Sequence, residues 1–69
     1  AKTVKDFDIT PREKEILEQL KKGLTYEQIA ANLFISYGTV RKHIENIYKK
    51  LQVDNKVSAL NIAVENKLV

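Results

Sequence analysis

The reactive side chains of this sequence are too few and too scattered for catalysis. The 69 residues contain one histidine, His43, and no cysteine, so neither a zinc site nor a nucleophile activated by a nearby base can be assembled. The hydroxyl residues Thr10, Thr25 and Ser36 each precede an apolar segment of helical spacing, where they fit the role of helix N-caps. We therefore expect no enzyme, no metal ion and no cofactor, and we expect His43 to pack at the edge of the core.

A second set of residues, in the segment 37–51, has the types and spacing of a binding surface. Its aliphatic residues Val40, Ile44, Ile47 and Leu51 recur at intervals of four, three and four, which places them within about 60° on one side of a helix. The other side and its flanks carry cations, an amide and a residue without a side chain. These residues are Gly38, Arg41, Lys42, Glu45, Asn46 and Lys49.

This polar side has the chemistry that a DNA duplex requires. Arg41 and Lys42 can reach the O6 and N7 acceptors of guanine, and Asn46 can pair with adenine. Lys49, about two turns beyond Lys42, is better placed for the phosphate backbone. Gly38 lies near the helix N-terminus, where free N–H groups favour phosphate and the missing Cβ permits close approach.

Several residues allow more than one role. Glu45 can accept from the N4 amine of cytosine, or it can repel phosphates and pair with Lys49 four residues on. Tyr26 and Tyr37 can touch phosphates or pack on neighbouring helices, whereas Tyr48 is expected beside the core. A charged outward face is also what any soluble helix shows, so the face alone does not decide the function.

The elements that position these residues are expected to be helices only. With two glycines and one proline, the chain lacks the turn residues of a β protein. Capping-box patterns begin helices at Thr10 and Thr25, and the first helix is expected to stop at a left-handed Gly23. Two further helices are predicted, over about 37–51 behind Ser36 and from a cap at Asp54 to Asn66.

The small size of the chain sets expectations for its apolar residues. A chain of this length buries only about 60% of its unfolded surface, so every large apolar residue is expected to be buried. Residues 1–8 lack periodicity and are assigned to the end of a linker, with Val4 and Phe7 as anchors. The last predicted helix carries an apolar strip for a partner protein or a second copy of the chain, formed by Val57, Leu60, Ala63 and Val64.

Charge and hydropathy narrow the class of protein. The net charge of +3 and the isoelectric point of about 9.3 permit a polyanionic partner, and residues 25–53 hold four basic against two acidic residues. No apolar run approaches the roughly 18 residues of a membrane span, and the N-terminus is too polar for a signal peptide. We expect a cytoplasmic protein without a membrane partner. Because there is no methionine, either the initiator was removed before Ala1 or this is a piece of a longer chain, and the small size of the domain favours the second.

The ordered set of motifs resembles the LuxR-type, or NarL/FixJ-type, DNA-binding domain of bacterial transcriptional regulators. The resemblance covers residues 9–69. No single motif identifies the family, but all of them together, in this order and at this spacing, are highly specific for it. The matching residues are Ile9, Thr10, Pro11, Arg12, Glu13, Ile16, Leu17, Gly23, Leu24, Thr25, Ile29, Ala30, Leu33, Ile35, Ser36, Thr39, Val40, Arg41, His43, Asn46, Ile47, Lys50, Leu51, Val53 and Ala59.

The resemblance implies a compact all-α, four-helix domain with a helix-turn-helix at residues 25–44. It implies that the helix at about 37–51 enters the major groove of double-stranded DNA and that the last helix joins two copies on DNA through Val57, Leu60 and Val64. It further implies an N-terminal signalling domain ahead of this C-terminal effector domain. Phosphate contacts are implied for Thr25, Ser36, Thr39 and Lys49, and base contacts for Arg41, Lys42 and Glu45.

The sequence departs from the family pattern at three positions. Lys56 stands where arginine is usual, and Glu45 is acidic where relatives often carry a neutral or basic residue. Gln52 replaces a frequent glycine, which leaves open a different shape for the turn after it. A shorter resemblance, over residues 23–30 and 36–40, is to region four of bacterial sigma factors, and a helical protein-interaction module is the remaining alternative.

Overall fold

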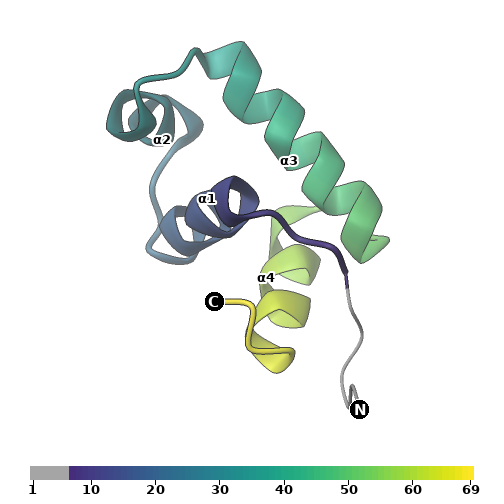
Figure 1. Ribbon diagram of the computed structural model, residues 1–69. Coiled ribbons are helices and arrows are strands. Elements are labelled where there is room, and N and C mark those ends of the chain that lie inside the picture. Colours follow the sequence, from purple (N-terminus) through teal and green to yellow (C-terminus); the bar gives the residue numbers. More distant parts are fainter. Residues whose placement is uncertain (1–6) are drawn as a thin grey trace.

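The computed structural model describes residues 7–69, and within that range the chain forms four helices and no strand. The helices are α1 (Pro11–Lys21), α2 (Tyr26–Leu33), α3 (Tyr37–Leu51) and α4 (Lys56–Glu65). In Figure 1, α1 lies in the middle, α3 runs along one side, and α2 and α4 lie apart. Of the described helices, α1 and α3 each contact all the others, whereas α2 and α4 do not touch. The predicted all-α fold is confirmed.

The helices begin at side chains that bind their own first turn. Thr10 accepts a hydrogen bond from the Glu13 N–H (3.1 Å), and Glu13 accepts one from the Thr10 N–H (3.0 Å). Thr25 and Gln28 form the same reciprocal pair, and Ser36 caps α3. These three predicted caps are therefore confirmed.

The predicted cap of α4 was wrong by one residue. Asn55, not Asp54, is the N-cap, because its Oδ1 accepts from the Ser58 N–H at 2.8 Å. The carboxylate of Asp54 instead accepts from the Asn55 amide nitrogen at 2.9 Å. An asparagine can cap the helix and bind this neighbour at the same time, since it carries both an acceptor and donors.

All four helices end in the same way, with a residue of left-handed backbone followed by an aliphatic residue. The second of these residues bonds back to the helix, as when the Leu68 N–H donates to the Ala63 carbonyl at 2.7 Å, which is the Schellman motif. The left-handed residues are Gly23 (φ 88), Phe34 (φ 58), Gln52 (φ 59) and Lys67 (φ 58). The aliphatic residues packed on the core behind them are Leu24, Ile35, Val53 and Leu68.

Only the stop at Gly23 was predicted, and it is confirmed. At Gln52 the turn has the usual left-handed shape although the glycine is missing. A left-handed conformation costs a residue with a Cβ roughly 1–2 kcal/mol. Three of the four helix ends therefore carry this cost, which tertiary packing of the following aliphatic residue offsets.

The core is formed by the predicted faces of α1, α2 and α3. Its fully or almost fully buried side chains are Ile16, Leu17, Leu20, Ile29, Ala30, Val40, Ile44, Ile47, Leu51, Ala59 and Ala63. To this buried set α4 contributes only the two alanines, while its Leu60 and Ile62 pack partly buried against it. The prediction that Ala63 belongs to an exposed strip was therefore wrong. The expectation that all large apolar residues are buried also fails, because Phe34 is 94% exposed and Val57 is 66% exposed.

A partly buried ion pair joins α3 to the start of α1. Lys50 donates to the Glu13 carboxylate at 2.7 Å and to the Asp8 carbonyl at 2.8 Å. Glu13 is only 4% exposed. Burial raises the pKa of this carboxyl, but the hydrogen bonds from Lys50 and from the Thr10 N–H, with the charge of Lys50, outweigh it, so the pKa lies below its usual 4.5.

This ion pair also holds the chain that leads into α1. Because Lys50 binds the Asp8 carbonyl, residues 8–10 follow the end of α3 before α1 begins. Phe7 and Ile9 pack against the core, which confirms the predicted anchor at Phe7. The other predicted anchor, Val4, and most of the assigned linker 1–8 lie outside the described residues.

Candidate nucleic-acid interface

Helices α2 and α3 form a tight pair. Only residues 34–36 separate them, and the left-handed Phe34 reverses the chain at the end of α2. Figure 1 shows the two helices meeting at a steep angle, with α3 extending well beyond α2. This is the helix-turn-helix arrangement that the sequence predicts for residues 25–44.

The polar side of α3 is directed outward. Its aliphatic side is buried at Val40, Ile44, Ile47 and Leu51. Four exposed residues on the opposite side line an open hollow of about 340 Å³, and these are Gly38, Arg41, Lys42 and Glu45. The geometry on which the sequence interpretation depends is therefore present, since this side is not packed against the protein's own interior. We call these four residues the α3 face.

Gly38 is not required by the packing of the chain itself. A Cβ built at this position would meet only the Ser36 hydroxyl, at 3.9 Å, which is ordinary van der Waals contact. The backbone is also right-handed and helical there, so no positive φ calls for glycine. A helical glycine destabilises a helix by about 1 kcal/mol relative to alanine, and nothing inside the protein explains why that cost is accepted.

Hydroxyl groups gather at the N-terminus of α3. The Ser36 hydroxyl accepts from the Thr39 N–H at 3.0 Å and lies 2.9 Å from the Thr39 hydroxyl, and both residues are exposed. The first amides of a helix have no partner within it, and here the first backbone bond is from the Val40 N–H to the Ser36 carbonyl. The amides of Tyr37 and Gly38, which precede it, therefore add to a locally positive, donor-rich end.

Three tyrosines connect α2 to α3. The rings of Tyr26 and Tyr37 lie 6.0 Å apart at 47°. Tyr26 is half-buried against the core, whereas Tyr37 is 45% exposed. Tyr48 packs beside the core as predicted, and burial followed by its interaction with the Tyr26 hydroxyl raises the pKa of Tyr48 to about 12. This contact helps to set the position of α3 on α2.

The other predicted site residues lie along the flanks of these features. Thr25 is exposed at the N-terminus of α2, Asn46 is half-buried and Lys49 is exposed. Within residues 7–69 there is no ion pair between Glu45 and Lys49, so the helical pairing considered for them does not form. His43 is half-buried at the edge of the core, as expected.

Two residues with specific roles were missed by the sequence interpretation. Lys50 was counted with the basic surplus of the central segment, but it is turned inward to Glu13. The signal was the carboxylate of Glu13 itself, because a capping-box residue that faces the core needs a cation or donors. Phe34 was assigned no role, and no local pattern marks its exposure.

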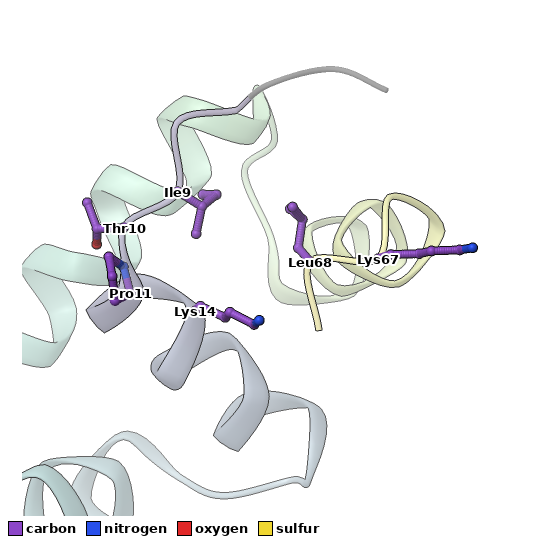
Figure 2. A pocket seen from close by; sticks show the side chains of 6 residues that line it. All are labelled: Ile9, Thr10, Pro11, Lys14, Lys67 and Leu68. Atoms are coloured by element: carbon purple, nitrogen blue, oxygen red, sulfur yellow. The ribbon is translucent and has the colours of Figure 1, made fainter. Parts of the chain in front are cut away.

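Two other hollows lie on the described surface, and neither is part of the helix-turn-helix. One of about 420 Å³ is lined by Glu18, Lys21, Lys22 and Val69. Another of about 390 Å³ lies between the start of α1 and the residues that follow α4 (Figure 2). There the Lys67 amine points away from the other labelled side chains, and the lining is otherwise mainly apolar. Residues 7–69 contain no group of three or more His, Cys, Asp or Glu that could hold a metal ion.

Helix α4 presents part of its predicted apolar strip. Val57 and Val64 are 66% and 48% exposed, and Leu60 between them is half-buried. Spacings of three and four place the three residues on one side of the helix. No helix within the described range is long and apolar enough to cross a bilayer.

The fold and the α3 face define a helix-turn-helix DNA-binding protein. The family described as bacterial regulatory proteins, luxR family, matches residues 8–63, so the chain belongs to the LuxR family of bacterial regulatory proteins, which are not enzymes. The match includes most of α4, whereas the resemblance to region four of sigma factors covers only residues 23–30 and 36–40.

Individual relatives agree with this assignment. The chain is 45% identical over 58 residues to the CsgBAC operon transcriptional regulatory protein of Escherichia coli, covering 84% of this chain and 27% of that protein. It is 49% identical over 51 residues to the nitrate/nitrite response regulator protein homolog of Haemophilus influenzae, covering 74% of this chain and 24% of that protein.

A solved structure shows the same fold. The crystal structure of the response regulator ChrA from a heme-sensing two-component system matches with a TM-score of 0.86 at 43% identity, over 99% of this chain and 33% of that one. The chain thus spans about a quarter to a third of the length of these relatives.

Proposed function

We propose that residues 9–69 are the C-terminal effector domain of a bacterial transcriptional regulator that binds double-stranded DNA sequence-specifically. The observation that carries the proposal is the α3 face, which is exposed and polar while the other side of α3 fills the core. In this arrangement α3 lies in the major groove, where a helix fits and where each base pair presents a distinct pattern. The natural location of such a protein is the cytoplasm.

The base contacts in this proposal come from α3. Arg41 and Lys42 donate to the O6 and N7 acceptors of guanine, and Asn46 pairs with adenine. Glu45 accepts from the N4 amine of cytosine. Support for this role comes from its position in the hollow beside both cations and from the lack of an ion pair with Lys49 within the described residues.

The phosphate contacts come from the two helix N-termini and from one lysine. Donors at a helix N-terminus bind phosphate without reading sequence. Lys49 adds a cation about two turns beyond Lys42. The residues with this role are Thr25, Tyr26, Ser36, Tyr37, Gly38, Thr39 and Lys49. Tyr26 is half-buried, and its hydroxyl also interacts with Tyr48.

Two copies are expected to bind together on DNA. Val57, Leu60 and Val64 form the contact between the α4 helices in this proposal, and a two-fold dimer reads half-sites about one helical turn apart. The response regulators among the relatives are about three times as long as this chain. The remainder of the protein is accordingly expected to include an N-terminal signalling domain.

In vitro selection from randomised duplexes tests the proposal, because it reports binding and half-site spacing together. On the selected site, Arg41→Ala should weaken binding by roughly 1–3 kcal/mol and relax preference at one base pair. Lys49→Ala should weaken binding to all sequences alike and lower the salt slope by about one. Enrichment of no sequence, or an Arg41→Ala variant that binds the selected site as tightly as the parent, would contradict the assignment of α3.

A further inference from the structure

Phe34 combines two features that are each unfavourable. Among the large apolar residues of 7–69 it is the most exposed, at 94%, and its backbone is left-handed, with φ 58 and ψ 41. A bulky residue rarely adopts this conformation, which glycine and asparagine tolerate far better. The turn between α2 and α3 therefore carries both a strained backbone and an apolar ring in water.

The fold does not need the ring. The equivalent positions at the ends of α1, α3 and α4 are Gly23, Gln52 and Lys67, so the turn forms with no side chain or with polar ones. The packing at this turn is made by the next residue, Ile35, which lies against the core. Sites where a residue is kept at a cost to stability are often functional sites.

The backbone of Phe34 lies close to the proposed phosphate-binding end of α3. Phe34 is two residues before Ser36, which places the two Cα atoms within about 7 Å of each other. The sequence contains no lysine or arginine between Lys22 and Arg41, so a contact at this turn would not depend on attraction between charges. An apolar ring in that position suits the sugar ring of a nucleotide, which offers C–H groups beside each phosphate.

We infer that Phe34 is a DNA-contacting residue whose ring packs on the deoxyribose next to the phosphate bound by Ser36 and Thr39. This inference rests on the proposed function and extends it to the turn. The ring adds affinity by burying apolar surface. Because it contacts the DNA backbone beside the major groove, it also restricts the orientation of α3 in the groove. The contact releases no counterions.

The test compares Phe34→Gly with Gln52→Gly. Both variants place glycine, which adopts the left-handed conformation without strain, at a helix end, and only the first removes the ring. Both should raise Tm by a few degrees. Phe34→Gly alone should weaken binding to the selected duplex, by about five- to tenfold, from the loss of part of a buried phenyl group. The loss should be the same at 50 and at 200 mM salt, in contrast to that of Lys49→Ala.

Other results would overturn the inference. If Phe34→Gly binds the duplex as tightly as Gln52→Gly does, the ring does not touch DNA and is free for a protein partner. If Phe34→Gly lowers Tm, the ring packs within the domain and the premise is wrong. If the parent protein binds no duplex at any salt concentration, the proposed function fails. If the parent binds and Phe34→Gly binds equally well, only this inference fails.

Discussion

Substitution of Gly38 by alanine should separate the requirements of the fold from those of DNA. In the free protein the new methyl group meets only the Ser36 hydroxyl at 3.9 Å. The substitution removes the helix penalty of glycine and the extra freedom of glycine in the unfolded chain. We therefore expect Gly38→Ala to be more stable by about 0.5–1 kcal/mol, which raises Tm by about 2–8 °C in a domain of this size.

DNA binding should change in the opposite direction. If the duplex approaches the Gly38 backbone, the methyl group enters space that the DNA occupies, and overpacking at a close contact costs about 1–3 kcal/mol. Binding should then be roughly five- to hundredfold weaker. Urea unfolding measures the first effect, and titration of a labelled duplex at constant salt and at a temperature where both proteins are folded measures the second.

Gly23→Ala is the matched control. Gly23 has φ +88 and open space around it, so alanine there is strained and should destabilise the fold by about 1–2 kcal/mol. Because Gly23 is outside the α3 face, although it precedes the N-terminus of α2, DNA affinity should change far less than in Gly38→Ala. A Gly38→Ala variant that is more stable and binds as well as the parent would show that the duplex does not approach this position.

Three further outcomes follow from the buried ionisable groups and from α4. The lowered pKa of Glu13 means that its contribution to stability is complete above pH 4.5 and is lost as the pH falls through the pKa of the folded state. In urea unfolding, Glu13→Gln should therefore be less stable than the parent at neutral pH, and its stability should depend less on acid pH. The pKa of Tyr48, raised to about 12 from 10.0, predicts stability that is complete below pH 10 and declines towards pH 12, and absorbance titration of Tyr48→Phe should lack the last-ionising tyrosine. Val64→Lys on the exposed side of α4 should leave Tm within a few degrees of the parent but abolish cooperative binding to a two-half-site duplex, and unchanged cooperativity would exclude this surface as the dimer contact.

The sequence predicted the elements whose signals are local. The capping boxes at Thr10 and Thr25 need only residues three apart, and the aliphatic stripe of α3 needs only its own spacing. These were confirmed. The outward direction of the α3 face followed from the same stripe, because the side opposite a buried stripe must face solvent unless another element covers it.

What the sequence could not predict depends on contacts between distant residues. Lys50 and Glu13 are 37 residues apart, and although the core-facing carboxylate of Glu13 calls for a cation, nothing in the sequence identifies Lys50 as its partner. The left-handed ends at Phe34, Gln52 and Lys67 escaped prediction because the usual signal is glycine. There, burial of the following aliphatic residue decides the backbone conformation instead.

The error in α4 has a related cause. Periodicity grouped Ala63 with Val57, Leu60 and Val64 on one exposed strip, but Ala59 and Ala63 are fully buried. Small residues allow close approach of α4 to the rest of the domain and leave the larger aliphatic side chains at its flanks. A pattern of apolar residues alone does not distinguish these two faces.

The most direct test of the account is an NMR titration of the domain with its selected duplex, followed through the backbone amides. We expect the largest shift changes at Gly38, Arg41, Lys42 and Glu45 and at the N-termini of α2 and α3, with little change along the outward side of α1. Changes that cluster on α1 or α4 and spare the α3 face would contradict the claim that this face binds DNA.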